Sequence, residues 1–505
     1  MPMSASALVP TATAPPAWVV AVLAFAAAYL LRRRRAASSL PLPPGPPKDP
    51  IIGHVRYMPT TRAPDVYHAW AQTYGDVMHF SLPGTNLIVL GSHQAAVDLL
   101  EKRSANYSDR PPFPVYDLSG WTDILPFMSA IDHFRFERQV LHTYLTADKS
   151  ASPALLDFQV DSARRLVDSL LKAKTEQYEP FFSRFATTLS VHLMTGHQIV
   201  SEDDPYLSLG EAVFHTLAET GPPGATGVDV LPILRYFPGW FPGAHYAGVA
   251  RSLYKIVRRM YEEPIANVQK QREAGIAPPS FLLHNLERMD EGKCPITVEQ
   301  LKGAAATLFA GAKQTTASTL SVFLLAMVLN QGVQRQAQAE LDAVVGKGNL
   351  PTFADRQRLP YIEGLVQEVF RWNPVLPLCV PHAAREEDEY RGWRIPKGSV
   401  VIPNVKGISR DAAVYANPDQ FDPTRFLPPR NEPRFMDLFG YGRRICLGRY
   451  VANNSMWITI ASVLAACSIT NALDANGKPI VPEVVMSDGI DCHPHEFLCT
   501  IKERN

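Results

Sequence analysis

The stretch that most constrains what this chain can fold into is residues 439–448, which read Phe-Gly-Tyr-Gly-Arg-Arg-Ile-Cys-Leu-Gly. Three glycines in it lack the Cβ atom that would keep the backbone away from a flat ring. The loop could therefore press against such a ring and direct the thiolate of Cys446 at its centre. The residues after Gly448 indicate a helix, whose N-terminus would favour the thiolate. Arg444 could pair with an anionic edge of the ring.

The composition limits the class of protein. Lysine plus arginine and aspartate plus glutamate number 49 each in 505 residues, so the formal net charge is zero and no electrostatic footprint for a nucleic acid is present. None of the six cysteines forms a C-x-x-C pair, which favours a reducing, cytosol-facing compartment over a zinc or redox motif. The length, without an obvious linker, predicts one large domain over residues 51–505.

The N-terminal region indicates a membrane anchor over residues 1–36. Residues 1–31 contain no charged side chain, and four arginines follow at residues 32–35. A cleaved signal peptide is the alternative, but its positive charge normally precedes the apolar stretch. The charge after the span predicts that the rest of the chain faces the cytosol. Residues 37–50 are rich in proline and predict a stiff hinge.

Helical patterns dominate the rest of the chain, with a smaller β part. Residues 77–90, interrupted by Pro83 and Gly84, predict a hairpin. Residues 131–275 indicate helices with breaks near residues 221–224 and 237–243. The second break is aromatic and apolar. It could face a membrane or a substrate entrance, or it could be a buried turn between helices.

A long helix is predicted to begin at Thr297, which has the spacing of a capping box with Gln300. Its apolar character, reaching Leu329, would also permit a second transmembrane span. However, Lys313 and Gln314 fall at its centre, where burying an ammonium group in lipid costs several kcal/mol. A central buried helix is therefore expected.

An amphipathic helix is predicted at residues 361–371, with Glu368 and Arg371 away from its apolar stripe. Judged from this pattern alone, the two residues form a solvent-exposed ion pair that is worth a few tenths of a kcal/mol.

Together these features resemble the cytochrome P-450 family of haem-thiolate monooxygenases, from the proline-rich hinge to the last strand. The resemblance implies a single large helical haem domain with an N-terminal transmembrane helix, and it makes Cys446 the axial ligand of the haem iron. The residues that match the family pattern F-x-x-G-x-R-x-C-x-G at every fixed position are Phe439, Gly442, Arg444, Cys446 and Gly448.

The resemblance also implies roles for charged residues. Glu368 and Arg371 match the family's E-x-x-R and would be buried with Arg425, as a triad that braces the cysteine loop. Arg138 matches the arginine that binds a haem propionate, and His382 falls where a second propionate partner lies. Judged by itself, His382 could equally be a capping or surface histidine. The loop residues expected to contact the haem are Phe439, Gly440, Arg444, Cys446 and Gly448.

Two positions depart from the family pattern. Gln314 stands where the family has an acid before the oxygen-activating threonine, here Thr315. A carboxyl group can pass on a proton, whereas an amide can only orient water, so proton delivery must differ and an acid restored at position 314 is expected to improve coupling. The Thr315 hydroxyl can bond the carbonyl four residues back and open the helix. Phe134 replaces a tryptophan whose indole N–H would bind a propionate.

The resemblance implies a single-pass protein of the endoplasmic reticulum whose catalytic domain faces the cytosol. It would insert one oxygen atom from O2 into a hydrophobic small molecule, by hydroxylation or epoxidation, as in fungal secondary metabolism. No flavin- or nicotinamide-binding segment is visible, so electrons are expected from NADPH through a separate NADPH-cytochrome reductase. The alternatives are a haem-thiolate isomerase, dehydratase or desaturase, suggested by Gln314, and a haem-binding protein without turnover.

Substrate contacts are also implied by the resemblance. Asp491 would bind a hydroxyl or an amine if it points inward, and otherwise it is an exposed turn residue. The positions expected to face the substrate pocket are Phe309, Ala312, Leu376, Leu378, Val380, Ile490 and Asp491.

Overall fold

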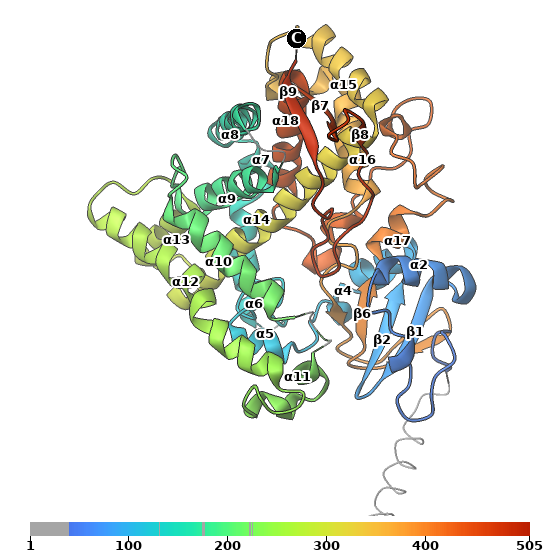
Figure 1. The fold of residues 1–505 in the computed structure, drawn as a ribbon. Helices are drawn as coiled ribbons and strands as arrows, with labels where there is room; N and C mark the ends of the chain where they lie inside the picture. The colour runs from blue at the N-terminus through green and yellow to red at the C-terminus, as the bar shows by residue number, and fades with distance from the viewer. Residues whose placement is uncertain (1–39, 131, 174–176, 222–223, 225, 505) are drawn as a thin grey trace, which may run out of the picture.

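The computed structural model describes residues 40–130, 132–173, 177–221, 224 and 226–504. The predicted anchor over residues 1–36 and the first residues of the predicted hinge lie outside these. Helices make up most of the described chain, and the strands form smaller sheets, which lie in separate places (Figure 1). The predicted class, mainly α with a smaller β part, is confirmed.

Helices of ten or more residues build the body of the molecule. They are α2 (Ala63–Tyr74), α6 (Asp132–Tyr144), α8 (Pro153–Lys172), α9 (Glu179–Thr195), α10 (Pro205–Glu219), α12 (His245–Glu273), α13 (Phe281–Asp290), α14 (Val298–Leu329), α15 (Gln331–Val344), α16 (Pro360–Trp372) and α18 (Arg449–Ala466). The shorter helical segments are η1 (Val55–Tyr57), α3 (His93–Ala96), η2 (Val97–Lys102), α4 (Ser104–Tyr107), α5 (Pro114–Ser119), α7 (Ala147–Ser150), α11 (Gly227–Val230), η3 (Pro232–Tyr236), η4 (Phe353–Arg358), α17 (Val405–Ser409), η5 (Pro423–Phe426), η6 (Asp437–Phe439) and η7 (Gly442–Arg444).

Strands of the described chain form a four-stranded sheet in the order β1-β2-β6-β3, a β4-β5 pair and a sheet in the order β8-β7-β9. Strands β1 and β2 are the predicted hairpin around Pro83 and Gly84, and β2 runs parallel to β6 with Leu87 opposite Val400. The strands are β1 (Val77–Leu82), β2 (Thr85–Leu90), β3 (His382–Ala383), β4 (Asp388–Tyr390), β5 (Trp393–Ile395), β6 (Val400–Pro403), β7 (Cys467–Leu473), β8 (Pro479–Ile480) and β9 (Cys499–Glu503).

Helix α14 runs diagonally through the middle of the molecule (Figure 1). It begins at the predicted capping box, in which Thr297 and Gln300 each accept a hydrogen bond from the other's backbone N–H. The helix is long and apolar enough to cross a membrane, but most of it is buried inside the protein. Lys313 at its centre is buried beside the Phe214 ring, with the ammonium nitrogen 4.7 Å from the ring centroid. The prediction of a central buried helix is confirmed.

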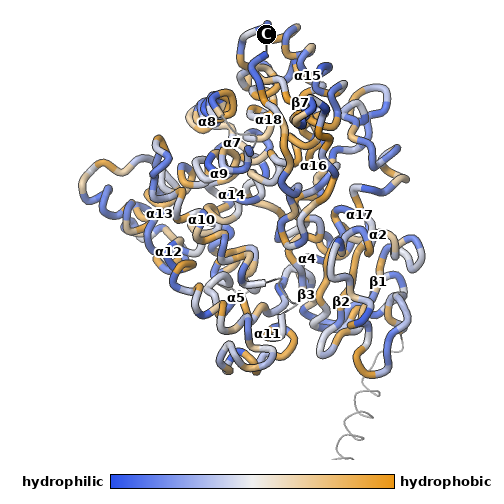
Figure 2. The backbone as a smooth tube through the Cα atoms, viewed as in Figure 1, coloured by the Kyte–Doolittle hydropathy of each residue, from blue (hydrophilic) through white to orange (hydrophobic). Residues whose placement is uncertain are grey.

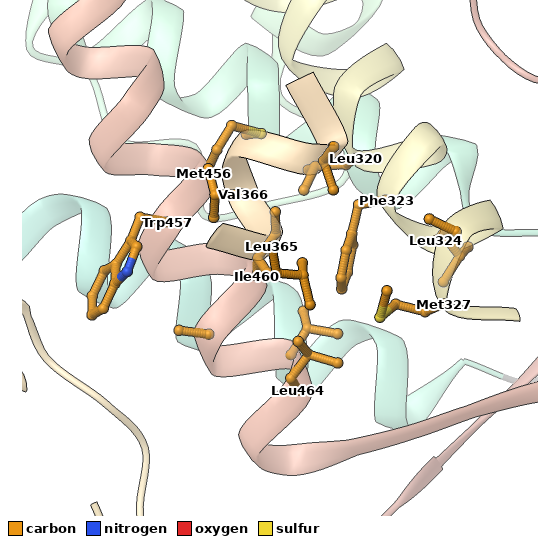
Figure 3. Packing of buried hydrophobic residues seen from close by; sticks show 14 of the residues in the cluster. Leu320, Phe323, Leu324, Met327, Leu365, Val366, Met456, Trp457, Ile460 and Leu464 are labelled. Carbon is orange, nitrogen blue, oxygen red and sulfur yellow. The ribbon is translucent and has the colours of Figure 1, made fainter. Parts of the chain in front are cut away.

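The main apolar core lies where α14, α16 and α18 meet, and Figure 2 shows hydrophobic residues concentrated there. Phe323 and Met327 of α14 pack with Leu365 of α16 and with Ile460 and Leu464 of α18 (Figure 3). These side chains are buried, so changing the volume of any of them would be felt by its neighbours. The core therefore fixes α16 and α18 relative to α14.

The aromatic break over residues 237–243 lies at the surface between η3 and α12. Trp240 in it is 83% exposed, and Tyr236, just before it, is 78% exposed. Phe237 and Phe241 are partly buried against the small cluster that includes Val228. The alternative of a buried turn is therefore wrong for Trp240.

The proline-rich segment is attached to the sheet. Pro44 accepts a hydrogen bond from the N–H of His79 at 2.9 Å, and Pro41 accepts one from the N–H of Arg394 at 2.8 Å. A Cβ atom on Gly45 would come within 2.3 Å of the His79 carbonyl oxygen, so only glycine allows this approach. The folded unit thus begins before residue 51, and the described part of this segment is not a free spacer.

Candidate active site

Cys446 lies immediately before α18, in a turn closed by a 2.7 Å hydrogen bond from its N–H to the carbonyl of Phe439. Burial raises the pKa of its thiol above the ordinary value, and the N–H groups of Gly448 and Arg449 and the guanidinium groups of Arg449 and Arg138 offset only part of this rise. The residue nevertheless keeps exposed surface. The predicted helix N-terminus therefore lies behind the sulfur and favours its ionised form.

Each of the three loop glycines fits its position for a different physical reason. Gly442 has φ +51°, and a Cβ there would lie 2.4 Å from the carbonyl oxygen of Leu100, so it permits packing against η2 and not against a ring. Gly440 has φ +77°, which a turn residue with a side chain rarely adopts. A Cβ on Gly448 would lie 4.0 Å from the sulfur of Cys446, so this glycine keeps space beside the sulfur.

The structure brings Glu368, Arg371 and Arg425 together with no exposed side-chain surface. Arg371 donates two hydrogen bonds of 2.8 Å to the Glu368 carboxylate, and Arg425 Nε lies 3.0 Å from one of its oxygens. Arg425 also binds Glu432, 2.7 Å away, which balances the second positive charge. The interpretation of Glu368 and Arg371 as an exposed pair is therefore wrong. The position of Glu432 in the sequence does not predict that it pairs with Arg425.

The triad supports the segment that leads to the cysteine loop. Arg371 donates to the backbone carbonyls of Ser409 and Pro418, and Arg425 donates to those of Ala416 and Gln420, at 2.8 to 3.0 Å. On the same helix, the Phe370 ring packs edge-to-face on the Phe439 ring, with centroids 5.7 Å apart. The position of Phe439 is thus fixed from α16.

Three arginines gather beside the cysteine loop: Arg138, Arg444 and Arg110. Arg138 donates to the carbonyl of Ile445 at 2.8 Å. Burial lowers the pKa of Arg444 to about 8 and that of Arg110 to about 9, and in each case a neighbouring arginine lowers it further. Asp109 is the one carboxylate of the described chain that opposes this for Arg110 and Arg444.

These arginines fit an anionic group. The Arg444 guanidinium donates hydrogen bonds to the carbonyls of Ser108, Leu125 and Met128, at 2.7 to 2.9 Å. It also lies over the Phe134 ring, 3.7 Å from the ring centroid. Excess positive charge in a low-dielectric setting favours binding of carboxylates. A cavity of about 680 Å³ is bordered by Arg138, Ile445 and Phe134 among others. A thiol beside clustered guanidinium groups is the donor set that haem, with two propionates and an iron, requires.

Arg110, which follows Asp109 in the loop between α4 and α5, was not predicted as a site residue. It donates to the carbonyls of Pro126, Val380 and Pro381 and so joins this loop to the segment after α16. Its sequence context gives no signal of this role, because the carbonyl groups that it binds come from other segments of the chain.

His382 is buried, so the alternative of a surface histidine is wrong. Its Nδ1 lies 2.7 Å from the carbonyl oxygen of Tyr107, and burial, followed by the charge of Arg110, holds its pKa well below the usual range. With the Nδ1 proton assigned to that bond, a neutral imidazole has no proton on Nε2. His382 could therefore donate to a carboxylate only as an imidazolium.

Thr315 and Gln314 lie on α14. The Thr315 hydroxyl donates to the carbonyl of Gly311 at 2.8 Å, the bond expected from the sequence. Gln314 Nε2 donates to the Asp491 carboxylate at 3.2 Å, and the Ser318 hydroxyl donates to the same oxygen at 2.7 Å. Asp491 therefore points inward, and the alternative of an exposed turn residue is wrong.

The remaining pocket positions differ in exposure. Phe309 has no exposed surface and packs in the core formed by α6, α9 and α12 with α14, so its side chain borders no solvent-sized space. The positions with partly exposed side chains are Ala312, Leu376, Leu378, Val380 and Ile490.

Glu137, next to Arg138 on α6, carries a buried carboxyl group, and its effect on stability can be measured as a function of pH. It is buried, its Oε2 has no hydrogen-bond partner among the described residues, and burial, followed by Asp123, raises its pKa to about 8 from 4.5. The unfolded chain releases this proton first, so the folded state loses stability as the pH rises from about 4.5 to about 8, by up to about 1.4 kcal/mol per pH unit. We expect Glu137→Gln to remove this loss, so its stability advantage over the wild type should grow across that window in urea unfolding.

The matched control for Glu137 is Asp168→Asn, which changes an exposed carboxylate on α8. Its difference from the wild type should stay within about 0.5 kcal/mol at every pH. A Glu137→Gln difference that is equally independent of pH would contradict the assignment.

A cysteine in a loop just before a long buried helix, with arginines beside it, is the arrangement expected of haem-thiolate proteins. Comparisons with known proteins agree with this class. The family model for cytochrome P-450 matches residues 43–488. A cytochrome P-450 monooxygenase of Armillaria gallica is 36% identical over 494 residues, covering 96% of this chain and 97% of that protein. The monooxygenase COX2 of Coprinopsis cinerea is 36% identical over 472 residues, with 92% and 89% covered. The monooxygenase claR of Ampulloclitocybe clavipes is 34% identical over 484 residues, with 94% and 88% covered.

The chain belongs to the cytochrome P-450 family. It is therefore an oxidoreductase that incorporates oxygen, and its family implies a haem-thiolate cofactor.

Proposed function

We propose that this protein is a monooxygenase that inserts one oxygen atom from O2 into a hydrophobic small molecule of fungal secondary metabolism, by hydroxylation or epoxidation. The observation that carries the proposal is the position of Cys446 at the start of α18, with Arg138 and Arg444 beside it. The relatives in Armillaria, Coprinopsis and Ampulloclitocybe, which are named monooxygenases, support the reaction class.

The haem, when bound, supplies dioxygen activation, and a thiolate ligand favours cleavage of the O–O bond. In this chain Cys446 would provide the thiolate, and Phe439, Gly440 and Gly448 would shape the loop around it. The guanidinium groups of Arg138 and Arg444, with Arg110 behind them, would hold the propionates. His382 would add to these only in its charged form.

Thr315 would act on the substrate side. Its hydroxyl is bonded to the carbonyl of Gly311, which keeps a hydroxyl group at the middle of α14 and available to hold a water molecule. Ala312 lies beside it on the helix, and Leu376, Leu378 and Val380 come from the segment after α16. These apolar side chains would exclude water and favour a hydrophobic substrate.

Electrons would come from NADPH through a separate NADPH-cytochrome reductase. Arg135, Arg385, Arg443 and Arg449 border the cavity beside the cysteine loop. Such a basic face fits an acidic electron-transfer partner, because complementary charge speeds and orients the encounter.

We also propose a membrane-bound protein, with a single N-terminal span over residues 1–36, on the cytosolic face of the endoplasmic reticulum. The described chain supports this with exposed apolar side chains: Ile51 is 94% exposed, and Tyr236 and Trp240 are exposed near α11. Residues 40–57, drawn in blue, and α11 both lie at the lower edge in Figure 1. Exposed aromatic and aliphatic side chains on one edge are typical of a membrane-contacting surface.

The proposal is tested with isotopically labelled dioxygen. With reductase, NADPH and a hydrophobic ligand that shifts the haem spectrum, we expect one labelled oxygen atom per product molecule, because the enzyme takes its oxygen from O2. Product mass measured in parallel with labelled water is the control. Conversion that proceeds without reductase, or a product without label, would favour the isomerase, dehydratase or desaturase alternative.

A further inference from the structure

The carboxylate of Asp491 is held against the middle of α14 from the loop between β8 and β9. Gln314 and Ser318, one helical turn apart, donate to the same oxygen, Oδ2, at 3.2 and 2.7 Å. The next residue, Cys492, donates its N–H to the carbonyl of Val375 at 2.8 Å, which attaches this loop to the segment after α16. The position of the carboxylate is thus set by two elements.

The same oxygen is connected to the surface. His493 Nδ1 lies 3.4 Å from Asp491 Oδ2, and the imidazole is 44% exposed. The hydrogen bond to Asp491 raises the pKa of His493, with burial opposing it and the charge of Glu179 on α9 adding to it. Burial, followed by the charge of Asp491, raises the pKa of the neighbouring Cys492 thiol to about 12. His493 is therefore the group in this cluster that exchanges protons with water near neutral pH.

The second oxygen of Asp491 differs from the first. Oδ1 is buried and accepts no hydrogen bond within the described chain. An unsatisfied buried acceptor costs about 1–3 kcal/mol, and a proton on this oxygen would convert it into a donor. The Gln314 amide can position the carboxyl group but has no proton to pass on.

We propose that Asp491 holds the proton that an acid at position 314 would otherwise hold, so that the proton-delivering carboxyl group has moved from α14 to the last loop. The N–H bond of His493 breaks as an O–H bond forms on Asp491 Oδ2, and water returns a proton to the imidazole. The Asp491 O–H bond then breaks as its proton passes to a water molecule beside the middle of α14, which restores the carboxylate. Gln314 and Ser318 position the carboxyl group. This inference rests on the proposed monooxygenase function.

The arrangement changes one expectation drawn from the sequence. An aspartate placed at position 314 alone would face Asp491, and two carboxylates at this distance disfavour each other's ionised form. The substitution Gln314→Asp should therefore not improve coupling by itself. An acid at position 314 should help only when Asp491 has been neutralised.

The test compares Asp491→Asn, the relocated pair Gln314→Glu with Asp491→Asn, and Asp488→Asn in the full haem-loaded protein with reductase. Asp488 is the matched control, because it lies in the same loop but accepts a hydrogen bond from the N–H of Arg62 instead. We expect Asp491→Asn to lower product formed per NADPH by roughly tenfold or more, with the balance released as hydrogen peroxide, and to change the pH profile. The relocated pair should recover most of that loss, and Asp488→Asn should match the wild type.

A second measurement does not depend on turnover. The pKa of His493 is followed by NMR in histidine-labelled holoprotein, with His493→Gln used to assign the signal. We expect Asp491→Asn to lower this pKa, and Asp488→Asn to leave it close to the wild-type value.

Unchanged coupling and pH profile in Asp491→Asn, while the wild type still incorporates labelled oxygen, would overturn the relay and leave the proposed function standing. Failure of the relocated pair to recover coupling, despite a normal haem spectrum, would show that Asp491 serves only the packing of its loop. Absence of labelled product in the wild type would instead count against the proposed function.

Discussion

Replacing Cys446 by serine is expected to abolish the thiolate-type spectrum of the reduced carbon monoxide complex and to reduce oxygen insertion to background. A hydroxyl does not ionise near neutral pH, so it cannot provide the thiolate charge that the N-terminus of α18 and Arg138 favour. The side chains have similar volume, so the fold should persist. The measurements are the difference spectrum and product formation in the presence of reductase.

Cys294→Ser is the matched control, since Cys294 is a partly exposed free cysteine in the loop before α14. It should retain both the spectrum and the activity. Survival of the thiolate-type spectrum in Cys446→Ser, or its loss in Cys294→Ser, would show that the ligand has been assigned to the wrong residue.

Neutralising Glu368 should have the largest effect on stability. In Glu368→Gln the guanidinium groups of Arg371 and Arg425 stay buried without their shared carboxylate. Removing one member of a buried ion cluster costs about 3–5 kcal/mol, because the remaining charge is left uncompensated. We expect a correspondingly lower free energy of unfolding in urea and little haem-loaded protein on expression, since the backbone carbonyls that these arginines hold lead to the cysteine loop.

Glu386→Gln is the control for this experiment. Glu386 pairs with Lys397 at the surface, where the two side chains are 74% and 66% exposed, so its loss should change stability by less than about 0.5 kcal/mol. Equal effects of the two substitutions would mean that the triad is no more important than a surface pair. The loss of stability in Glu432→Gln should fall between those of Glu368→Gln and Glu386→Gln. The Glu432 side chain is 11% exposed, and it contacts only Arg425 of the triad.

Local patterns sufficed for several elements. The capping box at Thr297, the hairpin around Pro83 and Gly84, and the breaks on either side of α11 depend on residues adjacent in the chain, so the sequence alone predicts them. The same holds for Cys446 before a helix, because the turn and the helix start are local.

Other features depend on residues that are distant in the chain. Glu368 and Arg371 have the spacing of an exposed pair, and only the packing of η5 against α16 buries them with Arg425. The membrane-span pattern of α14 is likewise ambiguous until its neighbours surround it. Arg110 and Glu432 carry no local signal of their roles, since the groups that they contact come from other segments.

The sequence by itself determined the family pattern around Cys446, the long central helix, and the absence of an acid at position 314. Only the tertiary structure decided what replaces that acid. Asp491 lies 177 residues from Gln314 along the chain, and a hydrogen bond of 3.2 Å joins them. A polar side chain acquires its partner through the folding of distant segments. The sequence of one helix therefore shows that a carboxyl group is missing. The group that compensates for it is identified only once the last loop has packed against that helix.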